Sequence, residues 1–372
     1  MNNDDLKIIA FYLPQYHPTE HNNKWWGEGF TEWTNVAKAR KLYPGHYQPK
    51  VPADLGFYDL RLPDVRQRQA ELAAEAGIYG FCYYHYWFSE GHEELDMPFK
   101  EVVRTKSPDL PFCLCWANES WYSKLWNKDG SAEKRLLAEQ LYPGAADNEA
   151  HFRSLLQAFK DERYIKVDGK LLFMIYQPLQ FEDFAAFKEQ WNRLAAENGL
   201  PGFFFVGQVL HTWQIDAVKE KGFDAVNHCH RLDGYYRDNE NLKWIGKAIN
   251  FVKRFIKIPF IIPYCKAISK ATFAEDRRDD VFPTMMPNWD HTPRSGRGGS
   301  VLHNSTPGLF ERHAEDVIST TSHKDGGRKI VFLKSWNEWG EGNYMEPDLK
   351  FGHGYIDALR HAIVNSKKET DR

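Results

Sequence analysis

Short apolar segments recur along the chain, and each is followed by polar or amphipathic sequence. Alternation of buried strands with helical segments through eight rounds predicts a closed (βα)8 TIM barrel of the α/β class rather than an open sheet. We expect a single domain over residues 1–372, with insertions in its loops. The eight segments have the length and apolar content of strands buried on both faces: Leu6–Tyr12, Ile78–Tyr84, Pro111–Trp116, Leu171–Tyr176, Phe203–Gln208, Ala225–His228, Val281–Met286 and Ile330–Ser335.

Two of the intervening segments carry the periodicity of amphipathic helices. The first opens at Pro63, where a proline needs no hydrogen-bonded N–H, and stops at Gly77. The second ends at Gly199, and its apolar residues share one stripe: Phe184, Phe187, Trp191 and Leu194. These helices are predicted to cover the outside of the barrel.

The segment from about 231 to 280 interrupts this rhythm, and we expect it to be an insertion after the sixth strand. A basic amphipathic helix of the kind found here can lie on an anionic membrane surface, so peripheral membrane contact is possible. A lid helix packed on the barrel explains the same pattern, and we favour it. The apolar stripe consists of Trp244, Ile245, Ile249, Val252, Phe255 and Ile256.

Aromatic, amide, carboxylate and imidazole side chains recur at the C-terminal ends of the predicted strands. In a (βα)8 barrel this is the end that carries the chemistry. Indole rings offer flat apolar faces on which a sugar ring can stack, and polar groups beside them can bind its hydroxyls. We therefore predict that the following residues line a sugar-binding pocket: Tyr12, Tyr84, His85, Trp87, Trp116, Asn118, Glu119, Gln208, His228, Trp289, Asn337 and Trp339.

The eighth strand leads into SWNEWGEG, where Glu338 and Glu341 lie three residues apart among tryptophans and glycines. Hydrolysis of a glycoside needs a carboxylic acid near the leaving oxygen and a second carboxylate as base or nucleophile. Two carboxylates held close together also push one pKa upward, which supplies the acid at neutral pH. A bare pair at this spacing is usually a cap or salt-bridge residue, but the position at a strand end favours catalysis.

Charge and composition narrow the possible partners. A formal net charge of −3 gives no electrostatic case for nucleic acid. His228 and His230 could ligate a metal, but no third ligand is evident, and a substrate contact is favoured. Arg294 and Arg297 are candidates for contact with an anionic sugar or phosphate. We expect a glycan partner, no metal and no cofactor.

The cellular location is inferred from the N-terminus and the cysteines. The first residues are acidic and lead directly into a strand, so no secretory leader is expected. No apolar run approaches the length of a membrane span. An odd number of cysteines, most of them in predicted strands, fits reduced and buried thiols, which predicts a cytoplasmic protein: Cys82, Cys113, Cys115, Cys229 and Cys265.

Five motifs together resemble the WbsX-type family, which is similar to glycoside hydrolase family 99: FYLPQYHP, WWGEGFTEWTNV, GFCYYHYWF, WANESW and SWNEWGEG. The resemblance extends from Ile8 to about Tyr355. It implies a (βα)8 barrel with retaining, endo-acting cleavage of α-mannosides. It also implies that Glu338 deprotonates the 2-hydroxyl of the sugar and that Glu341 is the general acid and then the base. The hydrolase motif resembles NEWHEG, and this chain has Gly340 in place of its histidine.

Three activities remain open. The favoured one is a retaining endo-glycosidase that cleaves a surface polysaccharide or oligosaccharide. WbsX-type proteins are associated with O-antigen or capsule gene clusters and are labelled glycosyltransferases, so a transferase of lipopolysaccharide biosynthesis is the alternative. No nucleotide-sugar signature supports it. The third possibility is a glycan-binding barrel that has lost catalysis.

Overall fold

The computed structural model describes residues 6–126, 132–230, 244, 248 and 258–370. Eight parallel strands form a ring in chain order, and β1 pairs with both β2 and β14 to close it. Each predicted apolar segment is one of these strands, which confirms the (βα)8 barrel. The strands are β1 (Lys7–Tyr12), β2 (Gly80–Ser89), β4 (Phe112–Trp116), β8 (Lys170–Ile175), β9 (Phe203–Val209), β10 (Ala225–His228), β12 (Val281–Met285) and β14 (Ile330–Leu333).

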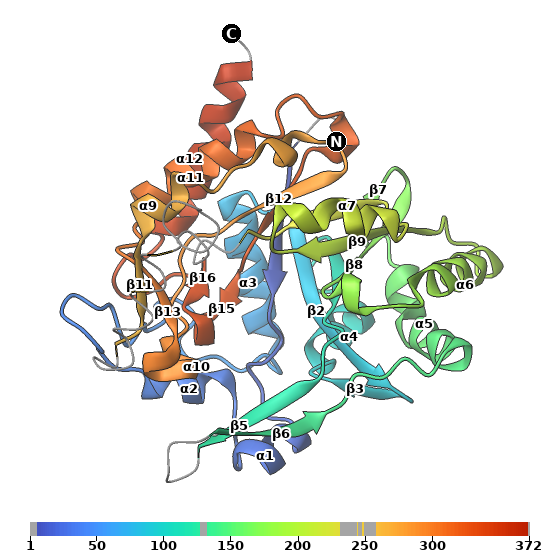
Figure 1. The fold of residues 1–372 in the computed structure, drawn as a ribbon, viewed down its shortest axis with the longest axis horizontal. Helices are drawn as coiled ribbons and strands as arrows, with labels where there is room; N and C mark the ends of the chain where they lie inside the picture. The colour runs from blue at the N-terminus through green and yellow to red at the C-terminus, as the bar shows by residue number, and fades with distance from the viewer. Residues whose placement is uncertain (1–5, 127–131, 231–243, 245–247, 249–257, 371–372) are drawn as a thin grey trace.

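Helices cover the outside of the ring (Figure 1). The first predicted helix begins at Pro63 and ends at Gly77, whose φ of 86° is left-handed. The second buries all four residues of its predicted stripe. The outer helices are α3 (Pro63–Ala76), α4 (Met97–Thr105), α5 (Ala145–Phe159), α6 (Phe184–Glu197), α7 (Ile215–Glu220), α11 (Pro307–Ser319) and α12 (Gly354–Thr370).

Alternate residues of each barrel strand face the interior or the helix layer. Inside the barrel, the ring of Phe11 stacks on Tyr84 and Phe332, with centroids 5.4 and 5.3 Å away. Its neighbour Tyr12 faces outward, and the hydroxyl donates a hydrogen bond to Gln69 Oε1 of α3 at 2.7 Å. Position along the strand therefore decides whether a side chain reaches the barrel mouth.

The short elements gather at the C-terminal end of the barrel, the lower side of Figure 1, toward which the arrowheads of β1 and β2 point. These connections carry the residues that surround the mouth of the barrel. They are α1 (Glu20–Trp26), α2 (Glu32–Lys38), β3 (His92–Glu94), β5 (Trp121–Trp126), β6 (Ala132–Ala138), α10 (Thr292–Ser295), β15 (Asn337–Glu338) and β16 (Asn343–Tyr344). A further short strand, β7 (Lys166–Val167), pairs with β8.

The last part of the predicted insertion forms a small unit beside the barrel. Strand β11 (Phe260–Pro263) pairs in parallel with β13 (Ser300–His303), and α9 (Tyr264–Ile268) follows directly. The apolar stripe predicted over residues 244–256 lies outside the described residues, apart from 244 and 248. None of the described helices combines the length and the hydropathy that a bilayer span requires.

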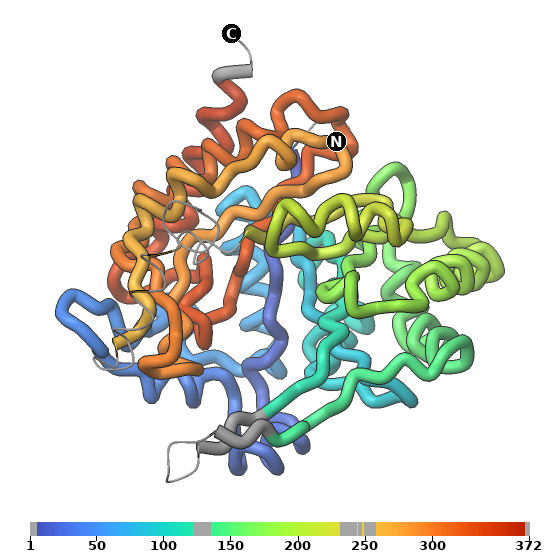
Figure 2. The backbone as a smooth tube through the Cα atoms, in the orientation of Figure 1, coloured from blue at the N-terminus to red at the C-terminus, as the bar shows by residue number. Residues whose placement is uncertain are grey.

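The first and last strands of the barrel lie side by side, as the blue and red tubes of Figure 2 show. Just beyond them, the amide of Asn337 accepts a hydrogen bond from Leu13 N at 2.8 Å and donates one to Leu13 O at 3.0 Å. Cys82, Cys113 and Cys115 of the strands and Cys229, just after β10, are buried as predicted, whereas Cys265 is exposed. The seam thus places the last strand and the motif after it beside the first connection.

Candidate active site

The motif after β14 folds into a small hairpin at the barrel mouth. Strands β15 and β16 pair so that Glu338 lies opposite Asn343, and a 3-10 turn between them carries Glu341. Gly342 ends that turn with a φ of 53°, and a Cβ there would lie 2.7 Å from the Cβ of Asp290. The hydroxyl of Ser335 fastens the base of the hairpin by donating to Asn343 O at 2.7 Å. The motif is therefore held in one conformation.

Three glutamates surround the guanidinium of Arg294, which lies on α10. Its Nη1 donates to Glu341 Oε1 at 2.6 Å and to Glu338 Oε1 at 3.3 Å, and its Nε donates to Glu32 Oε2 at 3.0 Å. The Glu32, Glu338 and Glu341 side chains are only 5%, 7% and 13% exposed. We call these four residues the arginine-centred cluster.

The arginine fixes the spacing of the two motif carboxylates. One nitrogen contacts an oxygen of each, so these two oxygens lie within about 6 Å of one another. Retaining glycosidases hold their carboxyl groups about 5–5.5 Å apart, whereas inverting ones leave about 6.5–9.5 Å for a water molecule. This upper bound on one pair of oxygens is compatible with the retaining arrangement.

The two carboxylates have different electrostatic environments. Burial raises the pKa of Glu338, and the charge of Glu341 raises it further. Burial would also raise the pKa of Glu341, but Arg294 and a hydrogen bond with His291 hold it well below its ordinary value. Glu338 is therefore the stronger base, and Glu341 is kept ionised as long as Arg294 contacts it.

Lys334 and a set of aromatic side chains form the wall beside Glu338. Lys334 Nζ lies 3.7 Å from Glu338 Oε2, and it donates to the hydroxyl of Tyr84 at 3.2 Å. The ring of Trp289 lies 6.0 Å from the same ammonium group. Tyr86 also borders the cluster: burial raises its pKa, and the charge of Glu338 raises it further. The wall therefore joins flat apolar surface to charged groups, as a sugar site requires.

Gly340 lies against the cluster, and the reason that it carries no side chain is steric. A Cβ at this position would lie 1.8 Å from Glu32 Oε2 and 3.0 Å from Arg294 Nε. Glu32 thus occupies the space into which a larger residue at position 340 would extend. In this chain, a glutamate from the first connection takes the place that the histidine of the NEWHEG motif would need.

Comparison with known families decides which family this barrel represents. The family model described as Glycosyltransferase WbsX matches residues 8–359. The chain belongs to the WbsX family. WxcX proteins of two strains of Xanthomonas campestris pv. campestris are 34% identical over 363 residues, covering 96% of this chain and 50% of theirs. The WbsX-family chain therefore spans about half the length of these curated relatives.

Solved structures share the fold of this WbsX-family chain. The GH99 endo-alpha-mannosidase from Bacteroides thetaiotaomicron has a TM-score of 0.55 and 14% identity, with 99% of each chain covered. A structure titled glycoside hydrolase-like protein has a TM-score of 0.57 and 16% identity, with 98% of this chain and 95% of the other covered. At such identities the likeness establishes the barrel fold alone.

Four predicted pocket residues of this WbsX-family member face the helix layer instead. Tyr12 bonds α3, as described above. The indole N–H of Trp87 donates to Asp147 Oδ2 of α5 at 3.1 Å. The indole N–H of Trp116 donates to the backbone oxygen of Trp87 at 2.9 Å. His85 contacts His151 of α5, with 2.8 Å between their Nε2 atoms. The prediction that these residues line the pocket is wrong because they occupy the outward positions of β1, β2 and β4.

Three further candidates hold the frame of the site together. Asn337 joins the barrel seam. Asn118 accepts a hydrogen bond from Gln177 N at 2.7 Å and is buried. Trp339 stacks on Tyr344 at 3.7 Å between centroids and donates to Glu346 Oε2 at 2.6 Å. These side chains use their polar groups on the protein itself, so sugar contact is corrected to a positioning role.

The remaining candidates divide between the site and the barrel core. The pKa of Glu119 is raised, chiefly because its carboxyl group is removed from solvent, and the charge of Lys334 opposes that shift. Gln208 is buried and donates to Asn227 Oδ1 at 3.0 Å. His228 Nδ1 lies 2.7 Å from Asp276 Oδ1, and both side chains are buried. The structure thus brings Tyr84 and Trp289 to the wall beside Glu338 and leaves Gln208 and His228 in internal hydrogen bonds, whereas sugar contact by Glu119 stays a prediction.

Proposed function

We propose that this WbsX-family chain is a retaining endo-glycosidase that cleaves an α-mannoside-like bond in a surface polysaccharide or oligosaccharide. The observation that carries the proposal is the pair of buried carboxylates at the C-terminal end of the barrel, both in contact with one nitrogen of Arg294. Retention is proposed from the resemblance to family 99, and the shared contact with Arg294, which keeps the two carboxylates close together, is compatible with it.

In the proposed reaction, Glu338 takes the proton of the 2-hydroxyl, and the resulting oxygen attacks the anomeric carbon of the same sugar. The glycosidic bond breaks, and the leaving oxygen receives a proton from Glu341. Water then opens the epoxide-like intermediate: Glu341 takes the proton of that water, and Glu338 returns its proton to the 2-oxygen. The raised pKa of Glu338 supports its part, since a stronger base removes a hydroxyl proton more readily.

Glu341 can hold a proton only if its contact with Arg294 loosens. The incoming sugar would have to separate the guanidinium from Glu341 while Arg294 keeps its bond to Glu32. Burial would then raise the pKa of Glu341 into the range of a general acid. Arg294 thus keeps Glu341 ionised until substrate separates the two side chains. Its Nε and Nη1 are already used by carboxylates, which argues against a primary role in binding an anionic sugar.

A glycosyltransferase is the second candidate, because the matching family model carries that description. The same steps give transfer when a sugar hydroxyl, in place of water, opens the intermediate. The difference then lies in which acceptor reaches the anomeric carbon. Free buried thiols support a cytoplasmic location, where a lipid-linked glycan would be met at the membrane surface.

The test incubates wild type, Glu338→Gln and Glu341→Gln with the surface polysaccharide of the producing organism in water enriched in oxygen-18. Hydrolysis releases oligosaccharides that carry one heavy oxygen at the new reducing end, as mass spectrometry will show. Loss of the general acid should lower the rate by about 10²–10⁴-fold. Glu101→Gln, which changes a partly exposed glutamate paired with Arg104 on α4, is the matched control.

Each alternative has its own result. Longer chains without heavy oxygen, formed in the presence of an activated donor, would identify a transferase. Binding that persists without any turnover, in wild type as in the variants, would identify a binding protein. Equal release of oligosaccharides by wild type and Glu341→Gln would refute the proposed catalytic pair.

A further inference from the structure

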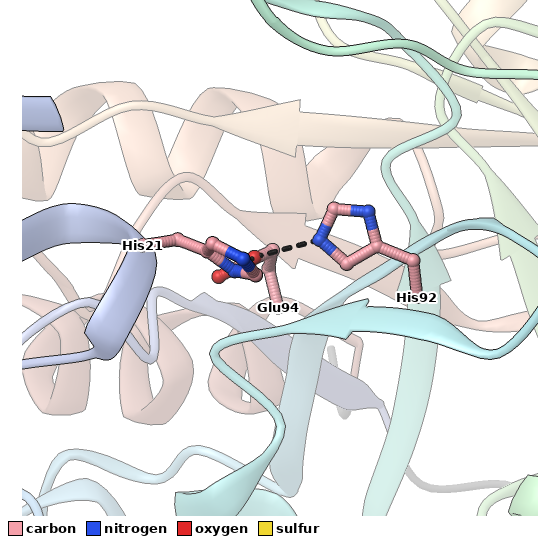
Figure 3. A group of neighbouring side chains, drawn as sticks. All are labelled: His21, His92 and Glu94. Carbon is pink, nitrogen blue, oxygen red and sulfur yellow. Dashed lines mark hydrogen bonds and ion pairs between the residues drawn. The ribbon is translucent and has the colours of Figure 1, made fainter. Parts of the chain in front are cut away.

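A second group of polar side chains lies apart from the arginine-centred cluster, where α1 meets the hairpin of β2 and β3 (Figure 3). His21 comes from α1, and His92 and Glu94 are the first and last residues of β3. One potential ligand atom from each residue lies within 4.8 Å of the other two. Side chains that are 71 residues apart in sequence thus converge on one point.

The two imidazoles approach the same carboxylate oxygen. His92 Nε2 lies 2.8 Å from Glu94 Oε1, and His21 Nδ1 contacts the same oxygen. The two rings are themselves neighbours, with centroids 5.1 Å apart, and Figure 3 shows them gathered at the carboxylate from separate elements. Two imidazole nitrogens and one carboxylate oxygen are the protein ligands of the open type of zinc site, in which water takes the fourth position.

The ion-pair partners of Glu94 in the described part of the chain carry no permanent positive charge. Its side chain is 3% exposed, and a buried carboxylate needs a positive partner or several hydrogen bonds. In the described part of the chain, the ion pairs of Glu94 are with these two histidines, which carry charge only when protonated. The nearby Lys100 pairs with Glu93 and Asp96 instead, at 2.5 and 2.7 Å. A divalent ion would supply the missing charge.

The rings are also held in place and open to solvent on one side. The ring of His21 stacks on Trp25 at 5.4 Å, and that of His92 packs on Phe88 at 5.2 Å between centroids. The two histidine side chains are 45% and 37% exposed, so an ion can enter from solvent. Packed rings lower the cost of fixing ligand orientation when a metal binds.

We propose that His21, His92 and Glu94 bind one zinc ion, which ties α1 to the β2–β3 hairpin. The two elements that zinc would join also carry aromatic side chains of the active-site wall. Trp25 packs edge-on against Trp121 at 6.0 Å, and Tyr86, the register partner of Glu94, packs on the same ring at 4.9 Å. Zinc would therefore hold together an aromatic layer that continues to the catalytic carboxylates. This binding does not depend on the proposed reaction.

The experiment uses the full chain without a histidine tag, stripped with a chelator and then titrated with zinc sulfate in a calorimeter. We expect about one zinc ion per chain, confirmed by elemental analysis, and a rise in melting temperature. His92→Ala and Glu94→Gln should each lower the affinity more than about tenfold, since even residues behind metal ligands cost 10–100-fold. Circular dichroism will show that the variants are folded.

Glu94→Gln separates the metal site from a purely hydrogen-bonded group, because glutamine keeps an acceptor oxygen but loses the charge. His353→Ala is the control: it removes a similarly exposed histidine that lies 2.7 Å from Asp54 Oδ2 and should leave zinc binding unchanged. Equal zinc affinity in wild type and Glu94→Gln would overturn the proposal. Tighter binding of manganese than of zinc at these residues would overturn the assignment of the metal.

Discussion

The contact between Gly340 and Glu32 leads to a sharp prediction about the WbsX-family site. In Gly340→Ala, the new methyl group would lie 1.8 Å from Glu32 Oε2, so the carboxylate must withdraw from Arg294. Overpacking costs about 1–3 kcal/mol, and the loss of a charged hydrogen bond costs about 1.5–3 kcal/mol. Because both effects come from one displacement, we expect a total loss of about 2–4 kcal/mol in the free energy of unfolding.

Removing the Glu32 carboxylate should restore most of the unfolding free energy that Gly340→Ala loses. Glu32→Ala alone loses its bond to Arg294, but Arg294 keeps Glu338 and Glu341 as partners. In Glu32→Ala combined with Gly340→Ala, the methyl group meets no carboxylate. The loss of unfolding free energy in the double variant should therefore be smaller than the sum of the losses in the two single variants, by at least about 1 kcal/mol.

Urea denaturation of the four proteins at one pH measures this coupling directly. Single losses that add to within about 0.5 kcal/mol would refute the steric argument, because independent sites behave in that way. The same pair also offers a change of motif: Gly340→His should fold only when Glu32→Ala makes room for it.

Three further predictions follow from the pKa shifts and the orientation of side chains. Arg294 lowers the pKa of both motif carboxylates, so in Arg294→Gln both limbs of the pH profile of kcat/KM should move to higher pH; a profile that stays in place would contradict this. Burial raises the pKa of Glu346 to about 7, above its unfolded value, so the folded state binds the extra proton and stability falls as pH rises from about 4.5 to 7. Denaturation at several pH values should show that the free energy of unfolding of wild type falls by up to about 3 kcal/mol over this range, whereas that of Glu346→Gln does not. An equal dependence of unfolding free energy on pH in the two proteins would contradict this role of Glu346. Tyr12→Phe should cost about 1–3 kcal/mol of stability through the unpaired Gln69 but leave kcat/KM unchanged, whereas a tenfold fall would contradict the outward position of Tyr12.

The barrel could be predicted from sequence because each of its strands is covered on both faces. Such strands appear as continuous apolar runs, and the turns between them supply clear stops such as Gly77. The same property hides the orientation of each residue. In GFCYYHYWF, residues on both faces are aromatic, so nothing in the pattern distinguishes inward-facing Tyr84 from outward-facing His85 and Trp87.

The paired glutamates could be found because both lie in one short motif. Their partners could not, because Arg294 is 44 residues from Glu338, and Glu32 is 262 residues from Arg294. From sequence, Arg294 was only a candidate for contact with an anionic sugar or phosphate, since an arginine near a strand end carries no mark of its partner. Lys334 could have been predicted to lie at the site, because it follows β14 directly and precedes Glu338 by four residues.

The hydrogen bonds between Asn337 and Leu13 would make the proposed glycosidase activity a measure of complete folding. Asn337 is next to Glu338 in the chain, yet two of the hydrogen bonds of its amide are with Leu13, which follows the first strand; a third, at 3.4 Å, is with the hydroxyl of Tyr58. A molecule with an open seam would lose both bonds to Leu13 and leave the neighbouring glutamate without a fixed position. In refolding experiments, the return of turnover should therefore coincide with the joining of the first and last strands and lag behind the return of helical signal.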